Sequence, residues 1–172
     1  MRLLHLVLGL LLLSSAIMAT SVTLRPVRDG YYTAWTASGC SGGDYRCVDE
    51  TPPSTRDYLY ATLTKKESTF QFSNLDTNVS IESVTLRYYA AQESFWDKTF
   101  KPMIRISGAN YYGDTITVGT IYAWYSETWT ANPATGMGWT LAEVNALEAG
   151  MQSIGAYAGG RVATIEAVVE SY

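Results

Sequence analysis

Alternation of apolar and polar side chains dominates the chain. Over residues 81–91 the apolar positions recur at every second residue and would share one face; they are Val84, Leu86, Tyr88 and Ala90. Residues 161–171 repeat the pattern with Ala163, Ile165, Ala167 and Val169. A period of two is that of a β-strand with one buried face. These two segments are therefore the strongest strand predictions.

Shorter segments with the same rhythm are separated by turn residues. Further strands are predicted over residues 21–27, 31–36, 58–63, 70–72, 100–107, 111–118 and 121–130. Turns are expected at residues 28–30, 65–67, 108–110 and 119–120, where glycine, asparagine, aspartate or lysine clusters occur. Roughly nine or ten short strands in this arrangement predict an antiparallel β-sandwich of the jelly-roll type.

One segment changes to a helical rhythm. Residues 132–138 hold an Asn-Pro pair and two glycines and form a loop. Thr140 and Glu143 then have the spacing of a capping box, and the apolar positions that follow at helical spacing are Leu141, Val144, Leu147 and Met151. Gly150 is placed to end the helix. The sequence therefore predicts one short helix near residues 140–149.

The amino terminus has the pattern of a secretory signal peptide. A positive charge at Arg2 precedes an apolar run over residues 6–13 and small residues over 14–19. The run is too short to span a bilayer, so an uncleaved membrane anchor is the less favoured alternative. Cleavage after Ala19, or alternatively after Ala16, leaves a single domain over about residues 20–172. The protein is therefore expected to be extracellular or at the cell surface, without stable membrane insertion.

Removal of the signal peptide changes the available chemistry. It takes away His5, the only histidine, and Arg2, so the net charge becomes −4 − 1 = −5. Catalytic triads and histidine-based metal sites are then excluded. A mildly acidic chain without a basic run also argues against binding to nucleic acid.

The two cysteines, Cys40 and Cys47, both lie in the secreted part of the chain. An oxidising compartment favours a disulfide between them, closing a small loop. The alternative, a metal pair, lacks the additional ligands that zinc or an iron–sulfur cluster requires.

Several segments together resemble a β-sandwich domain found in structural proteins of tailed phages and in uncharacterised environmental secreted proteins. The segments that carry the resemblance are Val48 to Pro53, Asp57 with Tyr58, Ser73 to Leu75, Asn132 to Gly136 and Trp139 to Gly150. The resemblance implies a non-enzymatic structural or attachment role and supplies no site residues. A signal peptide departs from the phage pattern and favours a cell-surface or filament subunit.

Enzymatic chemistry would have to use carboxylates alone. Asp49 with Glu50, or Asp114 with Glu127, are pairs that a glycosidase could use. Nothing in the sequence separates them from solvated acids, so we expect no enzymatic activity.

A second use of carboxylates is calcium binding. Acidic residues gather in loop-like sequence beside the expected disulfide; they are Asp44, Asp49, Glu50 and Asp57. Hard oxygen ligands from loops suit calcium, which makes this ion the candidate cofactor. The alternative is a solvated acidic loop.

Aromatic side chains suggest carbohydrate binding. Phe95 and Trp96 lie in a loop that the following hairpin brings near Tyr122, so Trp96 and Tyr122 could form a stacking platform. Local packing of the loop is the alternative. The remaining tryptophans are expected in the core or at interfaces; they are Trp35, Trp124, Trp129 and Trp139. Asn78, in an Asn-Val-Ser sequon, is a candidate glycosylation site.

Two functional hypotheses follow. The first is a secreted, non-catalytic structural or attachment subunit of a surface layer, filament or virion-like particle, with self-association or a surface partner. In it, the strand around residues 22–24 is free to pair with the sheet edge of a neighbouring copy. The second is a carbohydrate-binding module that contacts glycans through exposed aromatic residues.

Overall fold

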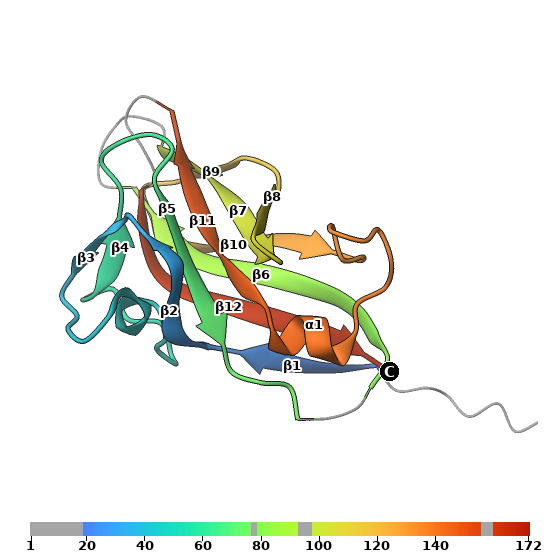
Figure 1. The fold of residues 1–172 in the computed structure, drawn as a ribbon. Coiled ribbons are helices and arrows are strands. Elements are labelled where there is room, and N and C mark those ends of the chain that lie inside the picture. The colour runs from blue at the N-terminus through green and yellow to red at the C-terminus, as the bar shows by residue number, and fades with distance from the viewer. Residues whose placement is uncertain (1–18, 77–78, 93–97, 156–159) are drawn as a thin grey trace, which may run out of the picture.

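Two antiparallel sheets of six strands each stack face to face in the computed structural model (Figure 1). The structure describes residues 19–76, 79–92, 98–155 and 160–172. The two sheets confirm the predicted β-sandwich, and the chain crosses repeatedly from one sheet to the other, as in a jelly roll. The predicted signal peptide lies almost wholly outside the described residues.

Sheet A is built around two long neighbouring strands. Its order is β10 (Ala123–Trp129), β6 (Ile81–Ala91), β12 (Arg161–Ser171), β4 (Tyr58–Tyr60) and β3 (Thr36–Ser38), with β1 (Thr20–Leu24) also paired to β12. β6 and β12 are the segments with the clearest sequence alternation, and their predicted apolar positions point inward except at Ala163. That residue lies in a bulge of β12, and Val162 joins the core in its place. Val84, Leu86 and Tyr88 are fully buried, for example.

Sheet B carries the other half of the core. Its order is β2 (Pro26–Thr33), β5 (Glu67–Phe72), β11 (Glu148–Ile154), β7 (Lys98–Ile106) and β8 (Ala109–Tyr112), with β9 (Ile116–Val118) paired to β7. The predicted strand over residues 111–118 is thus two strands, β8 and β9.

A tyrosine connects the two sheets across the core. Tyr88 on β6 donates its hydroxyl proton to the carbonyl oxygen of Gly150 on β11 at 2.6 Å. Its ring packs edge-on against Phe100 of β7, with ring centroids 5.0 Å apart. Because the hydroxyl is fully buried, this bond satisfies a group that would otherwise be costly to bury. The pairing of the sheets is therefore specified by a polar contact as well as by apolar packing.

The amino-terminal strands differ from the prediction. The expected strand over residues 21–27 is divided, because the chain leaves sheet A after β1 and enters sheet B at Pro26. The expected turn at residues 28–30 lies within β2. β1 pairs along one edge with β12, from Thr20 opposite Ser171 to Leu24 opposite Ala167. Among the described residues, no second strand pairs with its other edge, so the predicted pairing of this strand with a neighbouring copy stays a prediction.

The helix is shorter than predicted. α1 spans Leu141–Asn145, and the capping box between Thr140 and Glu143 is present as expected. The chain then becomes β11, so Gly150 lies within a strand and does not end the helix. A Cβ atom at Gly150 would lie 1.9 Å from the carbonyl oxygen of Ser68. The glycine is therefore needed because two strands approach closely at this position.

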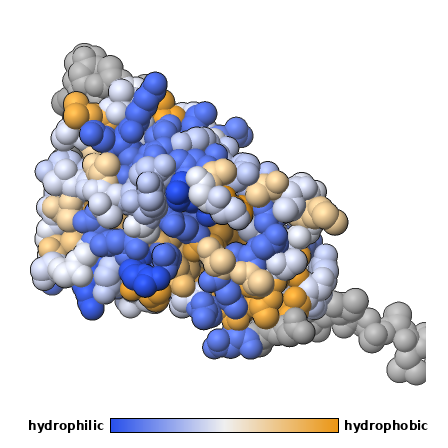
Figure 2. Space-filling view, viewed as in Figure 1, coloured by the Kyte–Doolittle hydropathy of each residue, from blue (hydrophilic) through white to orange (hydrophobic). Residues whose placement is uncertain are grey.

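The surface is mixed in character. In Figure 2, hydrophobic residues show between hydrophilic ones on the face turned to the viewer, which is the sheet B side of the sandwich. Among the described residues, no helix has the length and hydrophobicity needed to cross a membrane.

Candidate functional site

The outer side of sheet A carries a row of aromatic residues. In β6 the inward Tyr88 and Ala90 alternate with Tyr89, which therefore points outward, and Trp124 of β10 lies directly opposite Tyr89. On β4 the inward side chain is Leu59, so its two neighbours also face out. We call this group the aromatic face; it consists of Tyr58, Tyr60, Tyr89, Tyr122 and Trp124.

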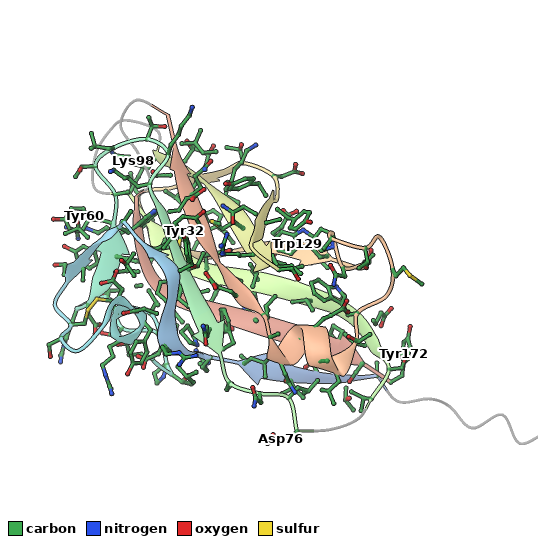
Figure 3. The ribbon with its side chains drawn as sticks, in the orientation of Figure 1. Tyr32, Tyr60, Asp76, Lys98, Trp129 and Tyr172 are labelled. Atoms are coloured by element: carbon green, nitrogen blue, oxygen red, sulfur yellow. A yellow bond between two sulfur atoms is a disulfide. The ribbon has the colours of Figure 1, made fainter. Side chains whose placement is uncertain are left out.

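The rings of the aromatic face contact one another. Tyr89 stacks on Tyr122 with centroids 5.3 Å apart and an angle of 24° between the ring planes, and it meets Trp124 at the same centroid distance and 49°. The ring centroids of Tyr58 and Tyr60 are 6.1 Å apart, and both residues lie on β4. Figure 3 labels Tyr60 at this side of the sheet. Trp124 exposes 37% of its surface. These mutual contacts hold the rings in place, so little side-chain entropy is left to lose when a ligand binds.

Arginine side chains lie over two of these rings. The guanidinium of Arg87 is 4.4 Å from the centroid of Trp124, and that of Arg161 is 4.1 Å from the centroid of Tyr58. The buried carboxylate of Glu166 fixes Arg87 through a 3.3 Å ion pair and also contacts Arg25 at 2.8 Å. Hydrogen-bond donors are thus placed beside stacking surfaces, an arrangement suited to a ligand with apolar faces and polar edges.

Tyr122 has a buried hydroxyl for which the described residues supply no hydrogen-bond partner. Burial raises its pKa to about 12, with smaller contributions from Tyr58 and Tyr89. The hydroxyl is therefore protonated at neutral pH and can donate. A buried donor without a partner destabilises the fold, and it is a feature that a ligand's oxygen could satisfy.

Sequence reasoning found part of this site. Tyr122 is the one predicted platform residue that the structure describes, and it lies within the aromatic face. Phe95, Trp96 and the sequon residue Asn78 lie outside the described residues. Trp124 is not a core residue, because its ring is exposed on the outer side of sheet A. That Trp124 is an interface residue stays a prediction. Tyr89 could have been found from the alternation in β6, which assigns it to the outer face.

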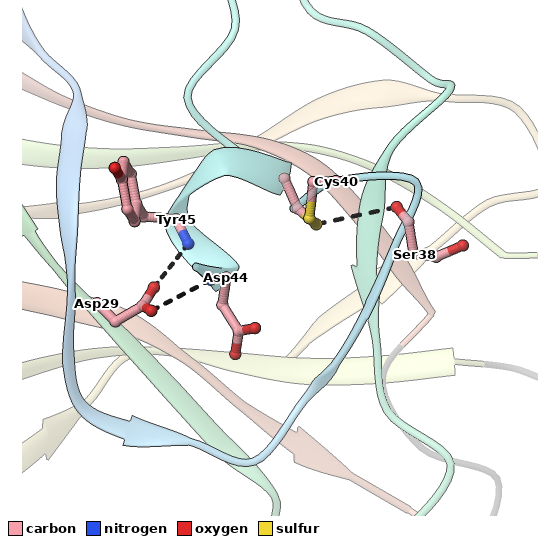
Figure 4. Close-up of a disulfide and its surroundings, with 6 residues drawn as sticks. Asp29, Ser38, Cys40, Asp44 and Tyr45 are labelled. Atoms are coloured by element: carbon pink, nitrogen blue, oxygen red, sulfur yellow. Dashed lines mark hydrogen bonds between the residues drawn. A yellow bond between two sulfur atoms is a disulfide. The ribbon is translucent and has the colours of Figure 1, made fainter. Parts of the chain in front are cut away.

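The predicted disulfide is confirmed and organises the acidic loop. Cys40 and Cys47 are bonded, with their Cα atoms 5.2 Å apart. The second cysteine ends a short 3₁₀ helix, Asp44–Cys47. Asp29 of β2 accepts the backbone N–H groups of Asp44 and Tyr45 at 3.2 and 2.7 Å (Figure 4). This places a carboxylate at the helix start, where it is favourable.

The four candidate calcium ligands do not form one cluster. Asp44 lies beside Asp29, whereas Glu50 pairs with Asp57. No group of three or more histidine, cysteine, aspartate or glutamate side chains suited to a metal occurs in the part of the chain that the structure describes. Calcium binding by Asp44, Asp49, Glu50 and Asp57 therefore stays a prediction.

Glu50 and Asp57 are neighbouring carboxyl groups, and their proximity affects the pKa of Glu50. Burial raises the pKa of Glu50 to about 7, and the neighbouring Asp57 carboxyl adds to the rise through a hydrogen bond and through its charge. One oxygen of each side chain, Oε2 of Glu50 and Oδ1 of Asp57, is buried without a hydrogen-bond partner among the described residues. Two adjacent carboxyls of this kind share a proton most easily.

This pair predicts a pH dependence of stability. The folded chain holds the Glu50 proton more tightly than the unfolded chain, whose reference pKa is 4.5. The free energy of unfolding should therefore fall as the pH rises from about 4.5 to about 7, and this contribution should be constant above that range. Glu50→Gln should flatten the trend and raise the melting temperature at about pH 8 by a few degrees.

Thermal unfolding of both proteins, followed by circular dichroism in EDTA between about pH 4.5 and 8, provides the measurement. Equal pH trends for wild type and Glu50→Gln would show that the pair does not share a proton. Asp76→Asn, at an exposed acid outside the loop, is the matched control and should retain the wild-type trend.

A separate hollow of about 630 Å³ lies between β2, β5 and α1. Much of its polar lining is already engaged: Arg28 donates to Gln71, and Asn145 bonds both backbone groups of Leu75. The hollow therefore offers less to a ligand than the aromatic face does.

The comparisons with known proteins give little beyond the fold. No protein-family model matches the sequence, and no curated protein matches it. Among solved structures, the chain is similar to CBM35 from Cellvibrio japonicus Abf62, at 12% sequence identity and a TM-score of 0.47, over 89% of this chain and 95% of that chain. We draw no functional argument from a likeness at this level. The β-sandwich implied by the sequence resemblance is confirmed by the strand pairing itself.

Proposed function

We propose that this protein is a secreted, non-catalytic carbohydrate-binding module whose ligand lies across the aromatic face of sheet A. The observation that carries the proposal is the stacked group of Tyr89, Tyr122 and Trp124 on the outer surface of a rigid sheet. Aromatic rings that serve only the core face inward, whereas these rings lie on the outer side, with more than a third of Trp124 exposed.

The chemistry of the face suits a sugar. A pyranose ring has apolar C–H faces that stack on aromatic rings, and hydroxyl groups around its edge that form hydrogen bonds. Tyr89 and Trp124 supply stacking surface, Arg87 supplies fixed donors, and the hydroxyl of Tyr122 supplies a donor without a partner. Because aromatic rings lie beside hydrogen-bond donors, the face favours a polyhydroxylated ligand over a purely apolar one.

The structural-subunit hypothesis has less support than the glycan-binding one. Its predicted contact uses the amino-terminal strand, and β1 is already paired along one edge with β12 over five residues, so only its other edge could pair with a neighbouring copy. Attachment to a surface remains compatible with the aromatic face, because a glycan on a cell or polymer would be the attachment point. Self-association is not needed for this function.

The test is a binding screen of residues 20–172 by affinity gel electrophoresis, in gels that contain barley β-glucan, galactomannan or polygalacturonate. We expect retardation in at least one neutral gel, and a clearly smaller retardation in Trp124→Ala. Retardation that is unchanged by Trp124→Ala would contradict the assignment of the ligand to sheet A.

A further inference from the structure

On the opposite side of the sandwich, the pairing between β2 and β5 is interrupted by a bulge. β2 pairs with β5 at Asp29 opposite Phe70 and again at Thr33 opposite Ser68. Three residues of β2, Gly30, Tyr31 and Tyr32, thus stand opposite the single residue Thr69. A bulge of this kind bends the strand and redirects its side chains.

The bulge packs closely against the outer side of sheet B. A Cβ atom at Gly30 would lie 2.5 Å from Oγ1 of Thr69 and 2.8 Å from Oε1 of Glu148, so only glycine fits. Glu148 accepts the backbone N–H of Tyr31 at 2.7 Å, and Thr69 accepts that of Tyr32 at 3.1 Å. Figure 3 shows Tyr32 lying over the strands of this sheet. Outward-facing polar side chains therefore hold the bulge in place.

The bulge presents a tyrosine to solvent. Tyr31 is 69% exposed, yet its ring is fixed by two neighbours. The guanidinium of Arg105 lies 4.2 Å from its centroid, and Tyr32 meets it edge-on at 4.8 Å. A large exposed ring held in one position is a stacking surface with little entropy left to lose.

Next to this ring lies a hydrogen-bonded network of amide and tyrosine hydroxyl groups around the carboxylate of Glu67. Asn110 donates to the hydroxyls of Tyr32 and Tyr112 at 3.1 and 3.3 Å. Glu67 accepts from Tyr112 at 2.5 Å and from Gln152 at 2.7 Å. The ring of Tyr112 is itself 41% exposed.

The charged groups of this network are one arginine and two glutamates. Arg105 faces Glu148 at 3.9 Å, and Glu67 is engaged by two neutral donors. These three described groups therefore carry no surplus of positive charge that would attract phosphate or an acidic polymer. The groups present suit a neutral molecule with apolar faces and many hydroxyls.

We propose that this surface is a second glycan-binding site, for a neutral oligosaccharide that stacks on Tyr31 and Tyr112 and hydrogen-bonds to the network around Glu67. The proposal goes beyond the function assigned to sheet A, because the two sites lie on opposite outer sides of the sandwich. One molecule then holds two glycan chains at once and bridges them.

The experiment compares wild type with Tyr31→Ala, Trp124→Ala and the double variant in gels containing barley β-glucan or galactomannan, with polygalacturonate as the acidic alternative. Trp124→Ala should keep a residual retardation that the double variant loses. The apparent Kd of the double variant should be at least about tenfold higher than that of Trp124→Ala. Tyr31→Phe should bind like wild type, since it keeps the ring. Tyr172→Ala removes an exposed tyrosine far from the bulge (Figure 3) and is the matched control.

The outcomes separate the two sites. Equal retardation of Trp124→Ala and the double variant overturns the second site, and so does binding of Trp124→Ala only to polygalacturonate. If Tyr31→Ala loses binding while Trp124→Ala binds like wild type, the second site is supported and the function proposed for sheet A is overturned. Light scattering of dilute β-glucan adds a further readout, because bridging by wild type should disappear in either single variant.

Discussion

Trp124→Ala is expected to weaken glycan binding by about tenfold to a hundredfold while leaving the melting temperature within a few degrees of wild type. The side chain is exposed on the outer side of sheet A and contacts Tyr89 and Arg87, so its loss removes stacking surface without opening a core cavity. Titration calorimetry with a soluble β-glucan or galactomannan oligosaccharide measures the affinity.

Ile121→Ala is the matched control for this prediction. Ile121 is 81% exposed and lies three residues from Trp124, so a non-specific effect of removing apolar surface would appear in it as well. Equal losses of affinity in both variants would show that the tryptophan has no particular role. A drop of more than about 10 °C in the Trp124→Ala melting temperature would show that the ring serves the fold.

Tyr122→Phe refines the same test, because it deletes one oxygen and keeps the ring. The hydroxyl is buried without a hydrogen-bond partner among the described residues, so its removal should leave stability unchanged or slightly raised. If a ligand oxygen satisfies this hydroxyl, the same change should weaken binding. Opposite effects on stability and on affinity are typical of a group kept for ligand binding.

Gly150→Ala should have the largest effect on stability. The added methyl group would lie 1.9 Å from the backbone oxygen of Ser68, and a backbone atom in the middle of a sheet cannot move aside cheaply. We expect a loss of at least about 3 kcal/mol, or a melting temperature lower by on the order of 10 °C, and a poor yield of folded protein if the loss is greater.

Gly138→Ala provides the control for this change. A Cβ atom at Gly138 has no neighbour within 4 Å, so the substitution should be neutral. Thermal unfolding of the two variants measures the difference directly. A Gly150→Ala protein as stable as the Gly138→Ala protein would mean that β11 and β5 are not packed as the structure has them.

The long strands were predictable because burial imposes a period of two on their side chains. β6 and β12 are central in sheet A, with one face toward the core, and their alternation located both strands and most of their inward residues. It did not reveal the bulge at Ala163, which places Val162 in the core. β11 was missed for a physical reason. Leu147 and Met151 are four residues apart, which fits a helix, while Ala149, Met151 and Ser153 also fit the inner face of a strand. The capping box located the start of α1, but no comparable signal marked its end.

The candidate sites were only partly predictable, because they depend on pairing between distant segments. Tyr89 and Trp124 are 35 residues apart in sequence and meet only through the register of β6 and β10. Tyr31 was assigned to an ordinary strand, since nothing in the sequence alone shows that Gly30 permits a bulge on the outer side of sheet B. The disulfide was predictable because the chain has two cysteines and an expected secreted location.

The central claim is that glycans bind across the aromatic face, and a titration followed by ¹H–¹⁵N NMR tests it most directly. The indole N–H of Trp124 gives a signal of its own, which can be assigned with the Trp124→Ala protein. With β-glucan or galactomannan oligosaccharides, we predict saturable shifts of this signal and of the amides of Arg87, Tyr89 and Tyr122. Saturable binding that leaves these signals unmoved, or no shift at about 10 mM ligand, would contradict the account.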